Sequence, residues 1–381
     1  MRPVSIVGIG QIPVQKQTEQ SLRQMGAQVV HLAMADAEVE RVDALFAGNM
    51  LGDELQGQKH VAALIADEAG LAGVEALDVR AATATGAAAL RMAYLAVASG
   101  EADLAIAVGV EKMSDGVPTP VLAKALDAEQ EVVNGDTLIG KNAEIMRLYM
   151  QEFHVPDDGF VNFALNAHAN ARNNPYALFR DKVVTREMVL NSRVIQYPLR
   201  LFDSSPICDG AAAVVLAPTD EARAYSPNPV KILGAGVATD RFRVFDREDP
   251  LFLQASHLSA LKAFRHANVH RRDVDFFELH DAFSIMAALI LEAVGYARRG
   301  EGWRLAQEMR IGLEGDIPIA TMGGLKARGH PVGATALYQV CEITLQLTGR
   351  AGPNQLPNPE IAMMQSVGGA GTTVITHIFG L

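Results

Sequence analysis

Residues 80–100 read RAATATGAAALRMAYLAVASG, in which a strand-like run ends, two threonines and a glycine follow, and an apolar helix begins. The first N–H groups of a helix have no intrahelical partner, and the helix dipole favours negative charge beside them. A helix that is apolar nearly all round is buried inside a large protein. This stretch therefore predicts a buried helix whose amino end faces a site, with Thr83 at the tip of the turn.

The same pattern occurs again near the other end of the chain, together with two further internal matches. TGAAAL (from Thr85) resembles VGATAL (from Val332), VSIVGIG (from Val4) resembles VKILGAG (from Val230), and VDALFAGN (from Val42) resembles VDFFELHD (from Val274). The three matches follow the same order in both halves, which indicates a duplicated domain. Short apolar runs alternate with helical patterns in each half, so we expect two α/β units, each with a central sheet between helices.

Alignment of the two halves pairs Gly86 with Gly333, and therefore Thr83 with His330. Equivalent helix ends can face each other across a pseudo-symmetric interface, so we expect Thr83 and His330 to meet in one pocket. A glycine-rich approach, GGLKARGHP, precedes His330. Histidine titrates near neutral pH, which makes His330 a candidate general base. A histidine that only caps the helix, or lies on the surface, is the alternative.

Two further segments carry candidate site residues. In FFELHDAFS, His280 follows a buried strand, where open α/β sheets place functional groups. The alternative is a turn histidine that is satisfied by Asp281. In QSVGGAGTT, residues 365–373, glycines follow a strand and allow backbone N–H groups to approach a substrate oxygen, as in an oxyanion hole. A simple tight turn is the alternative there.

Composition excludes several classes of protein. The chain has 381 residues and a formal net charge of −11 with no basic stripe, which disfavours a nucleic-acid partner. It contains no apolar run of about 18 residues, so no membrane span is expected. The opening MRPVSIVGIG resembles a first strand rather than a signal peptide, and we expect a cytoplasmic protein. Cys208 and Cys341 lie far apart without a CxxC motif, which predicts neither a disulfide framework nor a zinc site.

Residues 117–207 fit neither repeat. They are polar, rich in Asn and Arg, and helical only in patches, so we interpret them as an inserted loop domain over the site. The expected domains are an N-terminal half (1–116 plus 208–226), the inserted loop domain (117–207) and a C-terminal half (227–381).

Taken together, these motifs resemble the thiolase superfamily, and specifically its sterol carrier protein X-type and archaeal branch. RAATATGAAAL resembles the nucleophile turn, HDAFS the branch-specific histidine motif, GHPVGATAL the catalytic-histidine motif and QSVGGAGTT the C-terminal glycine loop. The resemblance covers essentially the whole chain. It implies an α/β thiolase fold, with two βαβαβαββ halves in five αβαβα layers and an inserted loop domain. It also implies acyl-CoA and CoA as substrates, no metal or redox cofactor, and a homodimer or homotetramer.

The sequence departs from the family at both catalytic cysteines. In the family, the cysteine of the nucleophile turn is acylated after the histidine of GHP removes its proton, and a second cysteine moves protons at the substrate. Thr83 occupies the first position, and the two known positions of the second cysteine hold Ala282 and Ser366. The resemblance implies two sets of site residues: catalytic Thr83, His280 and His330, and oxyanion or substrate-binding Ser366, Gly368 and Gly369.

Three functions are compatible with these residues. The leading expectation is a thiolase-like acyl-CoA acyltransferase with Thr83 at the nucleophile position, weak or altered in activity because an alcohol is far harder to ionise than a thiol; the other two are alternatives. We expect Thr83 rather to fill space and to form a hydrogen bond with His330 or a substrate oxygen. The second is a retro-aldolase acting on β-hydroxyacyl-CoA, like the lipid-transfer-protein aldolases, which lack the cysteine but tend to carry Tyr where His280 and His330 stand. The third is a non-catalytic acyl-CoA-binding protein that works with a small OB-fold partner.

Overall fold

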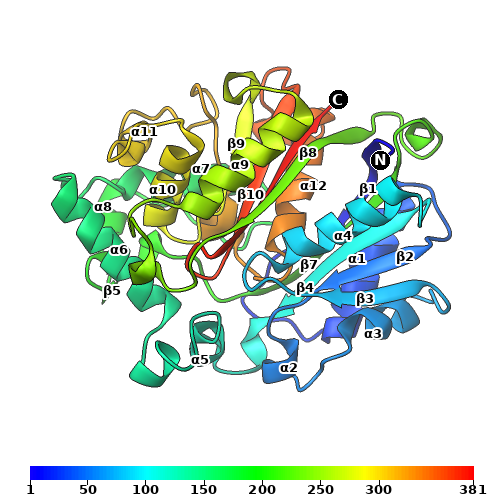
Figure 1. The fold of residues 1–381 in the computed structure, drawn as a ribbon, viewed down its shortest axis with the longest axis horizontal. Coiled ribbons are helices and arrows are strands. Elements are labelled where there is room, and N and C mark those ends of the chain that lie inside the picture. The colour runs from blue at the N-terminus through cyan, green and yellow to red at the C-terminus, as the bar shows by residue number, and fades with distance from the viewer.

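The strands form one nine-stranded mixed sheet, in the order β3-β2-β4-β7-β1-β8-β11-β10-β9 (Figure 1). The computed structural model describes all residues, 1–381. The strands of the first half are β1 (Val4–Gln11), β2 (Ala44–Gly48), β3 (Glu75–Val79), β4 (Ala105–Lys112) and β7 (Asp209–Pro218). Those of the second half are β8 (Val230–Thr239), β9 (Phe276–Glu278), β10 (Ile361–Gly368) and β11 (Thr373–Gly380). The order of the second half mirrors that of the first about the β1–β8 pair, which confirms the duplication.

The two halves are joined by a short antiparallel pairing of β1 with β8. Only Ser5 with Lys231 and Ile6 with Val230 are paired there. The counterpart of β3 that a complete duplication would place in the second half is reduced to Ile319, which bridges Phe277. Pro318 has no N–H, and the N–H of Ile319 donates to Ile311 instead, so the ladder stops after one residue.

The repeated glycines of VSIVGIG and VKILGAG have the same packing role in both halves. A Cβ atom added to Gly8 would lie 2.3 Å from the carbonyl oxygen of Ala33 in helix α1 (Leu22–Asp36). A Cβ atom added to Gly234 would lie 2.5 Å from the carbonyl oxygen of Ala263 in helix α9 (Gln254–Ala267). Glycine is required because the helix lies directly against the strand backbone. The repeated glycines therefore serve to pack a helix against the strand in each half.

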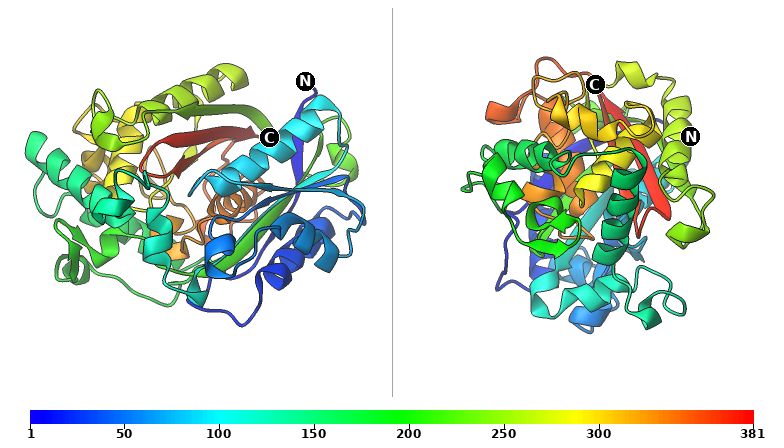
Figure 2. Two further views of the ribbon diagram at one scale, coloured as in Figure 1. Left: turned by 60° about the horizontal axis from the view of Figure 1, so that its bottom comes forward. Right: turned by 90° about the vertical axis from the view of Figure 1, so that its left-hand side faces the viewer.

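The helices and half-sheets form the expected five layers. Helices α4 (Thr85–Ser99) and α12 (Thr335–Leu347) lie in the middle, packed together between the two half-sheets. Helices α1 and α3 (Val61–Glu68) cover the outer face of the first half. Helices α9 and α10 (Ser284–Val294) cover the outer face of the second half (Figure 2). The amino ends of α4 and α12 are thus held inside the molecule, as the sequence predicted for α4.

The inserted segment lies at one end of the second half. It contains α5 (Pro118–Ala123), α6 (Leu138–Glu152), α7 (Val161–Ala171), α8 (Arg186–Leu190) and a small hairpin of β5 (Val194–Gln196) and β6 (Leu199–Arg200). Helix α6 packs on α10, and α7 packs on the π-helical turn Gly324–Arg328 that precedes His330. Two remaining short helices are α2 (Gly52–Leu55) and α11 (Gly302–Gln307). The inserted segment therefore touches both histidine-bearing regions.

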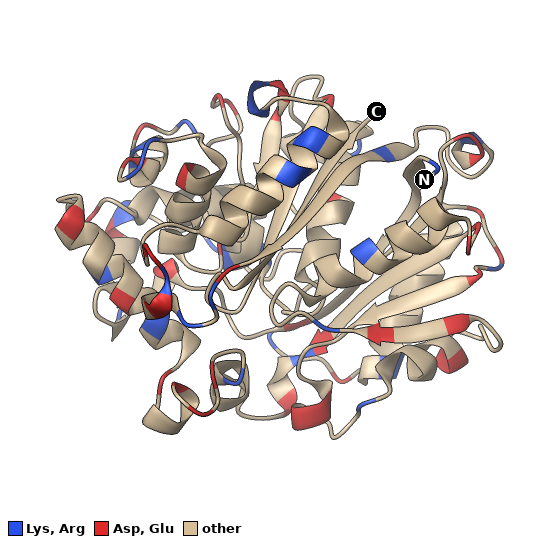
Figure 3. Ribbon diagram, in the orientation of Figure 1, with Lys and Arg blue, Asp and Glu red and all other residues tan.

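Charged residues lie mainly on the outer helices and connecting loops, while the central strands are almost free of them (Figure 3). None of the helices combines the length and the apolar character needed to cross a lipid bilayer.

Candidate active site

The turn before α4 is tightly fixed by its own threonines. Ala82 has a φ of +48°, in the left-handed region that non-glycine residues seldom adopt. The hydroxyl of Thr85 donates to the carbonyl of Ala82 and accepts from the N–H of Ala81, which holds this conformation. Thr83 is buried, and its hydroxyl donates to the carbonyl oxygen of Val367 in β10 at 2.6 Å. The expected hydrogen bond to His330 is not formed, because the single hydroxyl proton of Thr83 goes to that carbonyl.

The two candidate histidines lie against each other. His280 follows the carboxyl end of β9, and His330 lies in the loop that leads into α12. Their ring centroids are 5.1 Å apart and the rings are nearly perpendicular, at 87°. The alternative of a turn histidine satisfied by its neighbour does not hold for His280, since Asp281 bonds to Leu325 and Lys326 instead.

The hydrogen bonds of His330 define its tautomer. Its Nδ1 lies 2.6 Å from the hydroxyl of Thr335, and that hydroxyl donates to the carbonyl of Pro331 at 3.1 Å. A hydroxyl has only one proton to donate; with that proton on the carbonyl of Pro331, we assign a proton to Nδ1 of His330, which donates it to Thr335. The Nε2 atom is then the unprotonated nitrogen, and it is the one that can act as a base.

Both histidines are held neutral. Burial lowers the pKa of His280 to about 4, although the nearby Asp281 carboxylate acts in the opposite direction. Burial, together with the proximity of His280 and Arg328, lowers the pKa of His330 well below its ordinary value. Two cations side by side would repel each other. The pair is therefore suited to carry one proton at a time.

A cavity of about 370 Å³ opens beside these groups. Thr83, His280, His330 and Gly369 contribute to its wall, and Ala282 lies next to His280 on the same wall. The opposite wall comes largely from the inserted segment and from α10, through apolar side chains such as Leu138, Ile139, Phe202, Phe283 and Met286. Thr83 and His330 thus line one cavity, as the alignment of the two halves predicted, and the inserted segment covers it. The cavity is large enough and apolar enough for a small organic ligand.

The three candidate residues of the glycine loop differ in their position relative to the cavity. Gly369 lies on the cavity wall with a φ of +64°. Gly368 lies behind it, where a Cβ atom would come within 2.6 Å of the carbonyl oxygen of Ala81. Ser366 is fully buried on β10 outside the wall, and its hydroxyl has no hydrogen-bond partner. Of the three residues, only Gly369 contacts the cavity.

Neither cysteine can supply a nucleophile. Cys208 and Cys341 are both fully buried and free. Burial raises the pKa of the Cys208 thiol to about 12, and it raises that of Cys341 further. The sulfur of Cys208 instead accepts the backbone N–H of His330 at 3.1 Å, so it helps to position the histidine loop.

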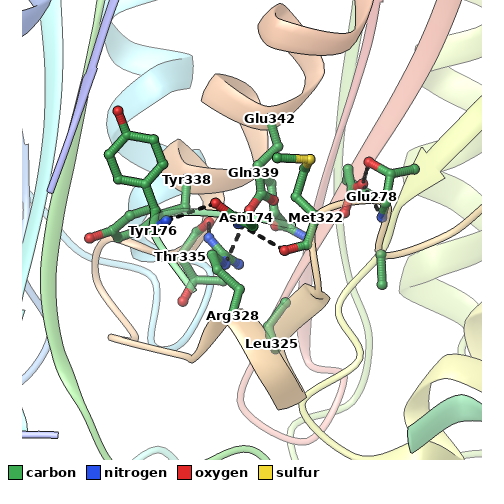
Figure 4. A network of polar contacts seen from close by, with 12 residues as sticks. Asn174, Tyr176, Glu278, Met322, Leu325, Arg328, Thr335, Tyr338, Gln339 and Glu342 are labelled. Atoms are coloured by element: carbon green, nitrogen blue, oxygen red, sulfur yellow. Dashed lines mark hydrogen bonds and ion pairs between the residues drawn. The ribbon is translucent and has the colours of Figure 1, made fainter. Parts of the chain in front are cut away.

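A buried network supports the histidine loop from behind. Arg328 is fully buried, lies over the ring of Tyr338 and is 3.5 Å from a carboxylate oxygen of Glu342 (Figure 4). Its guanidinium also reaches the carbonyl of Thr335, the partner of His330, at 3.5 Å. From the other half, the carboxylate of Glu111 accepts the N–H of Gly333 at 2.9 Å. Both halves thus contribute to holding His330 in place.

Three further polar residues on the cavity wall were missed at the level of sequence. His168 lies on α7, Lys182 follows that helix, and Lys326 lies in the π-helical turn. No motif or spacing separates His168 and Lys182 from other polar residues of the inserted segment, and Lys326 was passed over within the stretch GGLKARGHP. The packing of α7 against the histidine loop brings them together, and that packing is a tertiary contact.

Comparison with known proteins agrees with this architecture. The family model described as "Thiolase, N-terminal domain" matches residues 4–220, and "Thiolase C-terminal domain-like" matches residues 236–381. An acetyl-CoA acetyltransferase of Methanothermobacter thermautotrophicus is 42% identical over the full length of both chains. Human sterol carrier protein 2 is 29% identical over 99% of this chain and 72% of its own length.

Solved structures share the fold at lower identity. The "Ltp2-ChsH2(DUF35) aldolase" structure has a TM-score of 0.87 at 22% identity, covering 99% of this chain and 97% of its own. The acetyl-CoA acetyltransferase from Syntrophomonas wolfei has a TM-score of 0.75 at 16% identity, covering 100% and 99%. The resemblance inferred from the motifs is thereby confirmed, and the chain belongs to the thiolase family.

Proposed function

We propose that the protein acts on acyl-CoA thioesters, and that His280 and His330 move protons at the α-carbon and at the β-hydroxyl of the acyl chain. Three things support this proposal: membership of the thiolase family, a ligand-sized cavity, and two neutral histidines on its wall. A neutral imidazole with a free Nε2 accepts a proton, and backbone N–H groups at Gly369, on the cavity wall, would polarise a thioester oxygen.

The route that we favour is carbon–carbon bond cleavage of a β-hydroxyacyl-CoA without a covalent intermediate. His330 takes the proton of the β-hydroxyl, the bond between the α- and β-carbons breaks, and its electron pair moves onto the α-carbon and the thioester oxygen. The β-carbon leaves as an aldehyde or ketone, and the α-carbon then takes up the proton to give a shortened acyl-CoA. The hydrogen bond from Thr83 to Val367 is the observation that favours cleavage over acyl transfer, since it directs the only hydroxyl proton of Thr83 away from His330.

The second candidate is acyl transfer, in which Thr83 would be acylated in place of a cysteine. The name of the Methanothermobacter relative, which is 42% identical along the full chain, favours this candidate. The chemistry is harder, because the hydroxyl must first leave its carbonyl partner and lose its proton to a buried histidine. An oxygen ester is also a poorer acyl donor than a thioester.

Two assays separate the candidates. In the first, β-hydroxyacyl-CoA substrates of several chain lengths are incubated with the protein, and the released carbonyl compound and shortened acyl-CoA are quantified. In the second, acetoacetyl-CoA and CoA are supplied and thioester consumption is followed for the natural protein and for Thr83→Cys. We expect carbonyl release in the first assay, and thiolysis only from Thr83→Cys in the second. Thiolysis by the natural protein that is lost in Thr83→Ala would establish acyl transfer instead.

We further propose a homodimer or larger assembly in the cytoplasm, with a small OB-fold partner. Strand β3 is an edge strand with no buried residue, and Leu77 on it is 49% exposed, which suits pairing with another chain. The aldolase of similar fold carries a DUF35 component in its name, which supports the partner. Both assays should therefore be run with and without a co-expressed partner. Acyl-CoA binding without turnover under every condition would favour a non-catalytic binding role.

A further inference from the structure

The charge of the cavity wall is opposite to that of the protein. The chain carries a formal net charge of −11, yet none of the 27 residues that line the cavity is Asp or Glu. Three of them, Lys182, Arg193 and Lys326, are cationic. Lys326 is neutralised by Asp281, whose carboxylate lies 2.9 Å from its ammonium. Lys182 and Arg193 take part in no ion pair, so they are free to meet an anion.

Lys182 is held in position by aromatic rings rather than by a carboxylate. Its ammonium lies 4.7 Å from the ring centroid of Phe202 and 5.3 Å from that of Phe179. Two ring faces restrict where the ammonium can go but leave its charge uncompensated. A half-buried ammonium without a counter-ion is a site at which an incoming carboxylate gains a full ion pair.

His168 lies against the same two rings and adds a hydrogen-bonding group. Its ring centroid is 5.4 Å from that of Phe202 and 5.5 Å from that of Phe179. The side chain is only 3% exposed, and its Nδ1 atom is buried without a partner. Burial, Lys182 and Lys326 lower the pKa of His168 to about 4, while Asp281 acts in the opposite direction. An imidazole that burial keeps neutral, next to the unpaired ammonium of Lys182, adds a neutral hydrogen-bonding group to this part of the cavity wall.

We propose that Lys182 and His168 form a subsite for a carboxylate carried by the acyl part of the substrate, so that the protein takes acyl-CoA thioesters with a second acidic group. This inference rests on the proposed function, since it presupposes that the cavity binds an acyl-CoA. His168 is near the pair of Lys326 and Asp281, and Asp281 adjoins His280 in the sequence. The subsite is therefore connected to the histidine pair through buried residues.

The phosphates of CoA are a second source of negative charge for this part of the cavity. They are separated from the thioester by the whole pantetheine arm, so they belong near the surface, where Arg193 is exposed. His168 is too deeply buried for that role. An experiment must still tell the two sources apart, and it can do so because every acyl-CoA carries the phosphates whereas only some carry an acyl carboxylate.

Calorimetric titration of the full-length protein with two thioesters makes this distinction. Glutaryl-CoA carries a terminal carboxylate, and hexanoyl-CoA has a chain of similar length without the charge. We expect glutaryl-CoA to bind about tenfold more tightly, as a charge-assisted contact in a partly desolvated site allows. In Lys182→Met this preference should vanish, while the affinity for hexanoyl-CoA stays unchanged and shows that the variant is folded. Lys182→Gln repeats the test should the first variant not fold.

Lys16→Met is the matched control, since Lys16 is exposed, forms no ion pair and lies outside the cavity, and it should keep the full preference. At the second residue of the subsite, His168→Phe should lose part of the preference and His168→Gln should retain more of it. Equal affinity for both thioesters in the natural protein would overturn the subsite. So would an equal weakening of both ligands in Lys182→Met, because Lys182 would then bind the CoA phosphates. Failure of both thioesters to bind would overturn the proposed function as well.

Discussion

The two turns that duplication placed at equivalent positions use their polar atoms in opposite ways. In the first half, the hydroxyl of Thr83 donates its only proton to the carbonyl of Val367, so this hydroxyl has a structural role. In the second half, His330 uses Nδ1 to fix its orientation on Thr335 and keeps Nε2 free. The duplicated scaffold thus contains two similar helix ends. Of these two residues, only His330, whose Nε2 has no hydrogen-bond partner, can transfer a proton. The following changes test that contrast.

The largest loss of activity should come from replacing His330 and thus removing its free Nε2 atom. In His330→Asn, carbonyl release from β-hydroxyacyl-CoA should fall about a thousandfold, as expected when a general base is lost. The measurement is kcat with saturating substrate, and thermal unfolding verifies the fold. His60→Asn is a control on an exposed histidine far from the cavity. Retention of more than a tenth of the activity in His330→Asn would exclude His330 as the base.

Substitution of the duplicated glycines Gly8 and Gly234 should lower stability equally in the two halves, although the two turns differ in their chemistry. Gly8→Ala and Gly234→Ala each force a Cβ atom to within 2.5 Å or less of a helix carbonyl oxygen. We expect each to lower the free energy of unfolding by about 3 kcal/mol, as overpacking at a backbone contact does. Chemical denaturation of the two variants measures this. A large difference between them would show that the halves do not share this packing role.

The histidine pair should make the protein sensitive to acid. The pKa of His280 is about 4 when folded and near the ordinary 6.5 when unfolded, so the folded state prefers the neutral ring. The stability from this preference is present above pH 6.5 and is lost as the pH falls from about 6.5 to about 4, by up to about 3 kcal/mol. Denaturant unfolding across this range should show a smaller acid-dependent loss in His280→Asn than in the natural protein. Identical losses would mean that His280 is not held neutral.

The smallest effect on stability and activity should come from removing the hydroxyl of Thr83, which is already hydrogen-bonded to Val367. Thr83→Val keeps the shape of the side chain but removes the bond to Val367, so stability should fall by only about 1 kcal/mol. Carbonyl release should change by less than about threefold. Loss of carbonyl release by a hundredfold in a folded Thr83→Val protein would identify Thr83 as a catalytic residue and reverse the contrast between the two turns.

Much of this architecture could be predicted from the residues because it follows from local patterns. The ordered matches gave the duplication, and the paired positions of Thr83 and His330 followed from it. Periodicity located the strands of the first half and helix α4. A complete duplication would place a counterpart of β3 in the second half, but only a single bridge forms there, because Pro318 has no N–H and that of Ile319 donates to Ile311.

The hydrogen-bond partners and the burial of the site residues could not be predicted in the same way. Thr83 was expected to bond with His330 or a substrate, yet a carbonyl 284 residues away along the chain takes its proton. Likewise, Ser366 and Gly368 share a motif with Gly369, but strand direction buries the first two away from the cavity. Hydrogen-bond partners depend on distances of a few tenths of an ångström, which no spacing rule supplies.

The sequence by itself determined the duplicated α/β scaffold, the family and the residues at the two turns, because apolar periodicity and close-packed glycines are local constraints on the chain. Only the tertiary structure decided that Thr83 is bound to Val367, that His280 and His330 share one proton-poor site, and that Lys182 and His168 face the same cavity. Those outcomes depend on how the inserted segment packs on the second half, and on the burial that sets the charge of each side chain.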